Sequence, residues 1–221
     1  MPTLRTFLAI ALLGLSLSVG PLQAAEPPSA ESVQKSLDNI AARKLPEADQ
    51  KALQTVLQQT LTQLSNKNDY EKRLSDLKQQ LSTAPKQNLE NQRELERLTA
   101  TKVVPVAQRY ANLTVPQLEQ MLTDRSTQQS DLQKALADAN SLIITAQTRP
   151  ERAQAEISSN QSRSQEINSI LKSARDAGKP LSNERRDQLN AELAKLEAQT
   201  QLRRQELAGN SLLQDLGNSR R

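Results

Sequence analysis

The sequence predicts an all-α protein made of elongated helical hairpins with coiled-coil-like packing, about six helices after a signal peptide. Leucine and alanine recur every three or four residues along much of the chain, which is the spacing of one helix face. Hydrophobic residues make up 36% of the chain and aromatic residues 1%, well below the roughly 45–50% apolar content of globular domains. A narrow leucine and alanine seam between paired helices needs few bulky side chains, whereas one large core needs many. Prolines separate the periodic segments.

The N-terminus has the pattern of a secretory signal peptide over residues 1–24. Its apolar run, residues 7–19, is shorter than the roughly 20 apolar residues that span a bilayer. Cleavage is expected after Ala24 or, less favourably, after Ala25. Residues 25–221 then form an exported, periplasmic helical domain. An uncleaved N-terminal anchor and a cytosolic protein with a buried first helix are the alternatives.

The sequence of the first half of this domain predicts three helices. They are separated at Pro46 and Pro85, because proline is tolerated in the first turn of a helix and disrupts its interior. The polar stretch 66–69 is either a break in the second helix or an exposed part of it. Residues 102–113 are the least periodic and predict a connector with one helical turn. The expected helices cover about 32–44, 46–83 and 86–101.

A fourth helix, residues 114–147, has the clearest heptad pattern. Thr114 is expected to cap it, with Pro116 in its first turn. At 1.5 Å per residue this helix is about 50 Å long, longer than a small globular domain is wide, so we expect it to lie along a partner helix. Arg125 and Gln129 interrupt its seam. The apolar seam positions are Leu118, Leu122, Leu132, Leu136, Ala139, Ile143 and Ala146.

A joint is predicted at residues 147–154. Thr148 is expected to be the N-cap of a fifth helix, with Pro150 in its first turn and Glu151 closing a capping box. The preceding helix cannot pass through Pro150 undisturbed, because the ring clashes with the carbonyl four residues back at a cost of about 3 kcal/mol. The chain therefore either kinks or turns here.

The fifth helix is expected to end at a turn. Gly178 suits the left-handed position after a helix, and Pro180 cannot continue one. Ser182 then caps a sixth helix, whose seam contains the polar residues Thr200 and Arg203. Together with the two polar residues of the fourth helix, these specify either pairing within the chain or contacts between subunits. Oligomeric state and helix pairing are left open.

The C-terminal residues continue an apolar pattern after Gly209. Leu212, Leu213 and Leu216 recur at helical spacing, and only five residues follow them. We expect these leucines to be uncovered, so the domain looks truncated at its C-terminal end.

Catalytic chemistry is not predicted. The chain has no histidine and no cysteine, which removes the commonest general base and the commonest transition-metal ligands. The carboxylate pairs Asp131 with Asp138 and Glu94 with Glu96 lie on charged faces, where nothing desolvates them.

The net charge of +4 comes from basic and acidic residues that are interspersed, so nucleic-acid binding is not expected either. We expect no cofactor and no metal, and an envelope enzyme would need a nucleophile that we do not find.

Four segments occur in the same order and at similar spacing in one known family. The two strongest are the Gln-Thr-x-Pro-Glu-Arg joint and a Gly-Asn-x-x-Leu-Gln-Asp segment near the C-terminus. The four segments are residues 84–86, 113–119, 147–154 and 207–215. On these residues the chain resembles the periplasmic N-terminal region of the large mechanosensitive channels of the MscS superfamily, the MscK (KefA) type. The likeness covers essentially the whole chain after the signal peptide.

The resemblance implies a helical extension in front of an inner-membrane channel that releases ions and osmolytes when membrane tension rises. The implied partners are the membrane portion of the channel in the same chain, other subunits of a homo-oligomer, and the cell wall. The family's membrane helices are not within residues 1–221. This part is therefore expected to be a non-conducting module that interacts or modulates gating, in the periplasm and attached to the inner membrane. The alternative is a stand-alone periplasmic coiled-coil adaptor or chaperone-like protein.

Overall fold

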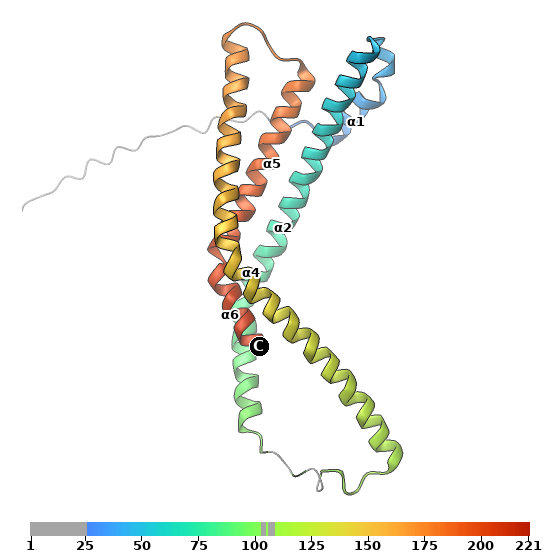
Figure 1. Ribbon diagram of the computed structural model, residues 1–221, viewed down its shortest axis with the longest axis vertical. Helices are drawn as coiled ribbons and strands as arrows, with labels where there is room; N and C mark the ends of the chain where they lie inside the picture. The colour runs from blue at the N-terminus through green and yellow to red at the C-terminus, as the bar shows by residue number, and fades with distance from the viewer. Residues whose placement is uncertain (1–25, 103–104, 106–108) are drawn as a thin grey trace, which may run out of the picture.

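The computed structural model describes residues 26–102, 105 and 109–221, and all regular secondary structure in this part of the chain is helical. The expected all-α fold with elongated, packed helices is confirmed (Figure 1). The expected cleavage positions Ala24 and Ala25 lie outside the described residues. The elements are α1 (Ala30–Asp38), the 3₁₀ turn η1 (Ala41–Arg43), α2 (Glu47–Ala100), α4 (Val115–Asp176), α5 (Asn183–Ala208) and α6 (Asn210–Arg220).

Two of the helices are longer than the sequence predicts. Helix α2 continues through Pro85, and α4 continues through Pro150, so each joins two of the expected helices. The stretch 66–69 is helical as well. Buried residues within about one turn before each proline explain the difference, because Ala84 and Ala146 have no exposed surface. Burial of the helix face close to each proline offsets the cost of the proline, about 3 kcal/mol.

The N-terminal helix covers one end of the body. The Ser29 hydroxyl accepts a hydrogen bond of 3.2 Å from the Ser32 N–H and so caps α1. Val33 of α1 is buried in a cluster that also contains Leu57 and Leu64 of α2 and Ala191 of α5. The first helix is therefore held where α2 and α5 lie side by side.

Helix α5 packs against both long helices and forms the centre of the body (Figure 1). The Ser182 hydroxyl caps α5 by accepting from the Arg185 N–H at 3.2 Å. Leu189, Leu193 and Leu196 of α5 are buried with Ile167 of α4. The partners of α5, which the sequence left open, are therefore α4 and α2.

The turn between α4 and α5 contains Gly178 with φ of +64°. This is the left-handed conformation that L-residues adopt with difficulty. Pro180 lies in the segment between the two helices.

Replacing Gly178 with alanine is expected to lower the free energy of unfolding by about 1 kcal/mol. An added Cβ has no neighbour within 4 Å, so the loss arises from backbone strain and not from a collision. Gly178→Asn is the matched control and should lose less, because asparagine tolerates this conformation. Urea unfolding followed by circular dichroism measures both variants. Equal losses for alanine and asparagine would argue against strain as the cause.

Helix α6 corrects the expectation that the C-terminal leucines are uncovered. Leu213 and Leu216 are at most 1% exposed, and Leu212 is half-buried. Helix α6 packs on both α2 and α4. Gly217 makes this close approach possible, since a Cβ there would lie 2.7 Å from Cγ1 of Ile143. The three helices therefore bury these leucines together.

Beyond α6 the two long helices diverge into separate arms joined at their far ends by the segment 101–114 (Figure 1). We call the C-terminal part of α2 from residue 89 the α2 arm, and residues 115–138 the α4 arm. The expectation that the whole fourth helix lies along a partner is therefore corrected, because only the part of α4 after the arm packs on α5 and α6.

Large hydrophobic side chains are exposed on both arms. They are Leu89, Leu95, Leu98, Val115, Leu118, Leu122, Leu132 and Leu136.

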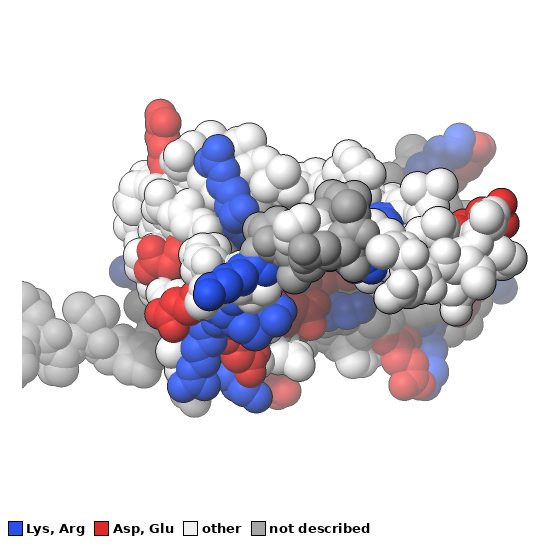
Figure 2. Space-filling view, turned by 90° about the horizontal axis from the view of Figure 1, so that it is seen from below, with Lys and Arg blue, Asp and Glu red and all other residues white. Residues whose placement is uncertain are grey.

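The surface has charges of both signs close together. In the view along the arms, Lys and Arg lie among Asp and Glu with uncharged areas between them (Figure 2). Among the described residues, no helix is long and apolar enough to cross a membrane.

Candidate functional site

The most informative site of the molecule is the bend of α4 and the polar contacts beside it. Helix α4 changes direction near its middle, between the part that packs along α5 and the part that passes α6 and continues into the arm (Figure 1). Pro150 lies inside the helix in this part of α4. Proline has no N–H to donate to the carbonyl four residues back, and this missing bond is a common cause of a kink. Of the two alternatives left by the sequence, the structure has a helix that is bent and not interrupted.

The expected N-cap at Thr148 is wrong. Its hydroxyl donates to the carbonyl of Ile144 at 3.2 Å, as serine and threonine do inside a helix. Glu151 consequently closes no capping box and is exposed. The cap signal fails because Ala146 and Ala153, on either side of the proline, are both buried against other helices. Tertiary packing therefore overrides the local signal.

The contrast between Pro150→Ala and Thr148→Ala tests the bend. Pro150→Ala restores a backbone hydrogen bond and should stabilise the protein by about 1–2 kcal/mol while straightening α4. Thr148→Ala should change the free energy of unfolding by less than about 0.5 kcal/mol, because no cap is lost.

Spin labels on both sides of the bend measure the change in shape. The chain has no cysteine, so Lys134→Cys and Lys172→Cys, both exposed, take the labels specifically. The distance between them should lengthen in the Pro150→Ala background. An unchanged distance, or a loss of about 1 kcal/mol in Thr148→Ala as expected for a lost cap, would contradict this view of the bend.

A buried ion-pair cluster links α4 to α5 just beyond the bend. The Nε of Arg203 donates to Glu156 on α4 at 2.6 Å, and its Nη1 donates to Glu206 at 2.8 Å. Arg203 is 9% exposed and Glu206 is 7% exposed. One turn away, the amide of Asn160 donates to the hydroxyl of Thr200 at 3.2 Å. The polar seam residues Thr200 and Arg203 thus serve pairing within the chain.

Burial and hydrogen bonding shift the pKa values of this cluster in opposite directions. Burial raises the pKa of Glu156, but the hydrogen bonds from Arg203 and Gln199 outweigh it, so the pKa is lowered overall. Burial also acts to lower the pKa of Arg203, and the hydrogen bonds to Glu206 and Glu156 raise it above its ordinary value. Both groups therefore remain charged at neutral pH.

Arg149, immediately before the proline, is the least satisfied charged group near the bend. Its Nε and Nη1 atoms are buried and have no hydrogen-bond partner. Burial lowers the pKa of Arg149, and the nearby negative charge of Glu206 opposes this shift. Sequence reasoning missed Arg149, and its position beside Pro150 in the recognised joint was the available signal.

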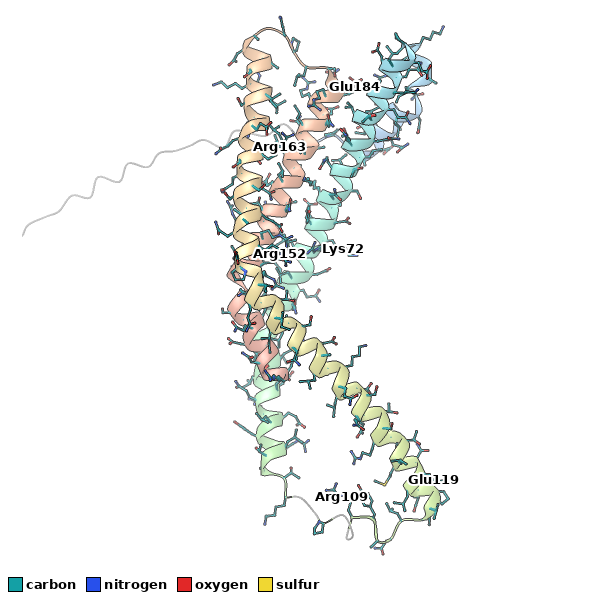
Figure 3. All side chains as sticks on the ribbon, viewed as in Figure 1. Lys72, Arg109, Glu119, Arg152, Arg163 and Glu184 are labelled. Carbon is teal, nitrogen blue, oxygen red and sulfur yellow. The ribbon has the colours of Figure 1, made fainter. Side chains whose placement is uncertain are left out.

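A second ion pair joins α4 and α5 nearer the turn at Gly178. Arg163 donates from Nε to Glu192 of α5 at 2.7 Å and from Nη1 to Glu166 at 2.8 Å. These hydrogen bonds raise the pKa of Arg163. Figure 3 shows that the charged residues labelled on it are spread along the molecule, with Glu184 near one end and Glu119 near the tip of the α4 arm. The ion pairs of Arg43 with Glu184, Arg163 with Glu192 and Arg203 with Glu156 connect separate elements at different levels of the body.

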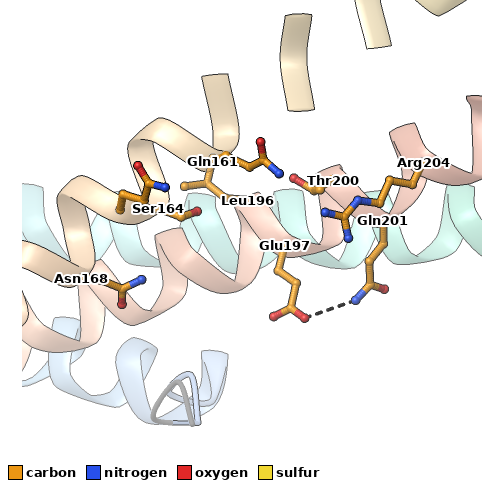
Figure 4. A pocket seen from close by; sticks show the side chains of 9 residues that line it. Gln161, Ser164, Asn168, Leu196, Glu197, Thr200, Gln201 and Arg204 are labelled. Atoms are coloured by element: carbon orange, nitrogen blue, oxygen red, sulfur yellow. Dashed lines mark hydrogen bonds between the residues drawn. The ribbon is translucent and has the colours of Figure 1, made fainter. Parts of the chain in front are cut away.

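A polar groove of about 500 Å³ runs between α4 and α5, on the same stretch as the ion pairs. Its walls are mostly amides and hydroxyls, and Leu196 is the one apolar side chain among the residues that line it (Figure 4). The Gln201 amide donates to Glu197 at 3.3 Å along one side. No aromatic side chain is available there to stack on a base or sugar. The groove is therefore a polar surface between two helices.

The other joints predicted from sequence lie far from the bend. Thr114 begins α4, where the side-chain carbonyl of Gln117 accepts from the Thr114 N–H at 2.9 Å and Pro116 is in the first turn. This joint is at the tip of the α4 arm, whereas Gly178 and Pro180 are at the opposite end of α4. The structure therefore does not bring the predicted joints together. One lies at the start of α4, one at its bend and one just after its end.

The carboxylates have no arrangement suited to binding a metal in the part of the chain that is described. No group of three or more acidic side chains lies close enough to hold an ion there. Glu94 forms a bidentate pair with Arg97 on the surface, and this hydrogen bonding lowers its pKa. The chemistry that the arrangement supports is helix-to-helix recognition through charge and shape.

Comparison with known proteins identifies the family. Residues 36–221 match the family described as the mechanosensitive ion channel porin domain. Neither a curated protein nor a solved structure matches the chain. The match begins within α1 and runs to the last residue, so it includes the bend, the ion-pair cluster and both arms. The chain belongs to the mechanosensitive ion channel porin domain family.

Proposed function

We propose that this chain is the periplasmic helical domain of an MscK (KefA)-type mechanosensitive channel. In this role it does not conduct ions; it interacts with neighbouring structures or modulates gating, and the channel portion lies in the same polypeptide. The observation that carries the proposal is the family match over residues 36–221, together with the joint and C-terminal segments that resemble this channel type. The expected location is the periplasm, attached to the inner membrane.

The shape of the domain suits a mechanical role. Helix α4 has 62 residues, which at 1.5 Å per residue gives a contour of about 90 Å. One part of it is fixed to α5 and α6 by buried leucines and ion pairs, and the other part projects as an arm. A force on the arm is therefore transmitted to the bend at Pro150 and to the body.

The first test is to read the coding sequence beyond codon 221. The proposal expects apolar runs of about 20 residues, each long enough to span a bilayer. A stop codon directly after Arg221 would contradict it and favour the stand-alone alternative.

The second test uses patch-clamp recording of the full-length channel. Deleting residues 36–221 should leave single-channel conductance unchanged, because the domain is not the conduit, and should shift the membrane tension at which the channel opens. A control deletion limited to residues 26–29, before α1, should leave both quantities unchanged. Loss of conductance with an unchanged opening tension in the first deletion would overturn the proposal.

One observation favours the stand-alone adaptor or chaperone-like alternative. The arms expose leucines that are 56–72% accessible at Leu98, Leu122 and Leu132, and exposed apolar surface can hold unfolded segments. In that case the purified chain should suppress aggregation of an unfolded model protein, and Leu122→Ser should weaken the suppression. No suppression at a fivefold excess of the chain would remove this alternative.

A further inference from the structure

The α4 arm exposes the continuation of the face that α6 covers on the same helix. Ile143 and Ala139 of α4 lie against α6, since a Cβ at Gly217 would be 2.7 Å from Cγ1 of Ile143 and 3.3 Å from the carbonyl oxygen of Ala139. The same seam continues toward the arm tip with Leu136 and Leu132, at heptad spacing from Ala139. The interface with α6 therefore runs on into the arm without a change of face.

Exposure on this seam begins where α6 stops. Ala139 is 1% exposed, Leu136 is 43% exposed and Leu132 is 70% exposed. Helix α6 keeps its hydrogen bonding to its last turn, because the Arg221 N–H donates to the carbonyl of Gly217 at 3.2 Å. The seam of α4 thus loses its cover at the level of the last α6 residues, while its own apolar pattern continues.

Helix α6 enters the gap between the arms in the same direction as α2. Near the start of α6, Gly209 lies against the side chain of Leu81 of α2. Near its end, Ser219 is hydrogen-bonded to Asn88 and Asn91 of α2. In Figure 1 the C-terminus lies between the two long helices at the point where they diverge. A helix extended in this direction would therefore lie between the two arms.

We propose that the polypeptide following Arg221 continues α6 as a helix that covers the exposed leucines of both arms. This inference rests on the proposed function, in which the channel portion follows in the same polypeptide, and it names the partner of the arms. Continuity with the α6 interface identifies this segment as the occupant, together with the direction in which α6 ends. The arms and the extended α6 would then form a bundle of three helices.

The register of the observed contacts determines which levels meet. Each further residue of a helix adds about 1.5 Å, in α6 as in the arms. Leu132 of α4 and Leu95 of α2 are then both level with a position about four residues after Arg221. Leu118, near the tip of the α4 arm, is level with a position about 20 residues after it. A helical extension of roughly 20 residues therefore covers both arms.

The α2 arm does not take this place on the α4 arm while α6 is seated. Arg220, at the end of α6, donates to Gln87 of α2 at 2.6 Å. Ser219 donates to Asn88 at 2.8 Å and accepts from Asn91 at 3.0 Å. Direct closure of the arms would have to break these bonds, whereas a continued α6 keeps them.

Cysteine labelling of the full-length channel tests this cover. The sequence up to Arg221 has no cysteine, so L122C and L132C can be labelled singly with a maleimide once any later cysteine is replaced by serine. Each should react roughly tenfold more slowly, or slower still, in the full-length channel than in the chain that ends at Arg221. T127C is the matched control, because Thr127 is exposed on the opposite face of α4 and should react equally fast in both proteins.

A helix break distinguishes the continuation of α6 from a neighbouring subunit. Two adjacent prolines placed about four residues after Arg221 interrupt a helix, so they should return the labelling rate of L132C to that of the shorter chain. Two alanines at the same positions are the control and should leave L132C protected. Protection that survives the prolines, or a disulfide between two subunits through a lone L132C, would assign the cover to a neighbouring copy and overturn the inference.

Failure of this inference and failure of the proposed function give different results. A reading frame that stops at Arg221 would refute the proposed function and remove the covering helix with it. If the reading frame continues, equal labelling rates for L122C and L132C in the full-length channel and in the shorter chain would refute only the cover of the arms. Protection that is lost with the two prolines and kept with the two alanines is the result expected.

Discussion

Arg203→Met is expected to lower the free energy of unfolding by about 3–5 kcal/mol, since it removes one partner of a buried ion pair and leaves the other charged. Arg203 bonds Glu156 across the α4–α5 interface at 2.6 Å and Glu206 on its own helix at 2.8 Å. Glu206 is 7% exposed, so it has little access to water once the guanidinium is gone. Chemical unfolding followed by circular dichroism gives the loss directly.

Matched variants separate the charge effect from the change in side-chain shape. Arg204→Met makes the same replacement at an exposed neighbour and should cost less than about 0.5 kcal/mol. Adding Glu206→Gln to Arg203→Met should recover part of the loss, because the uncompensated charge is then removed. Similar losses in the Arg203 and Arg204 variants would contradict the importance of this ion pair.

The same pair gives a pH dependence with a definite sign. The pKa of Glu156 is lowered in the folded protein, so its contribution to stability is fully present above its ordinary pKa of 4.5. It is lost as the pH falls below that value toward the lowered folded pKa. Unfolding measured between pH 6 and pH 3 should therefore show a smaller acid-induced loss in Arg203→Met than in the native protein. An equal loss in both would indicate that other carboxylates control the acid response.

Leu216→Ala is expected to cost about 2–5 kcal/mol, the range for truncating a fully buried leucine. Leu216 has no exposed surface and lies in α6, which packs on both long helices where they begin to diverge. Its loss leaves a cavity beside Gly217, where close contact with Ile143 limits any collapse. The variant should also open the arms, because α6 is bonded to α2 through Ser219, Asn88 and Asn91 and packs closely on α4 at Gly217.

The control for Leu216 is an exposed aliphatic residue near the same level. Ile144 is 60% exposed, and Ile144→Ala should change the free energy of unfolding by less than about 0.5 kcal/mol. Thermal unfolding, together with the radius of gyration from X-ray scattering, measures stability and opening. A Leu216→Ala protein as stable as the Ile144→Ala protein would contradict the view that α6 closes the body.

The sequence predicted features that depend on a few neighbouring residues. The Thr114 start of α4, the Ser182 start of α5 and the left-handed Gly178 all follow from local hydrogen bonding and backbone sterics. The family was also recognisable, because short motifs retain their order and spacing. Local chemistry acts on these positions whatever the rest of the molecule does.

The prolines show where local reasoning failed. Thr148 and Pro150 have the pattern of a helix start, yet the helix continues through them. The same holds for Pro85 in α2. The helices continue because Ala84, Ala146 and Ala153 are buried against helices that are distant in the sequence. No local sequence pattern shows which helix will cover these alanines.

By itself the sequence determined an all-helical, elongated protein, the family to which it belongs, and the caps and turns at the ends of α4 and α5. Only the tertiary structure decided that two prolines lie inside helices, that α6 covers the C-terminal leucines, and that one heptad seam is buried for half its length and exposed for the rest. The reason is that caps and helix periodicity depend on residues within about one turn. A partner helix is chosen by burial and charge pairing between residues such as Glu156 and Arg203, which come together only in the folded chain.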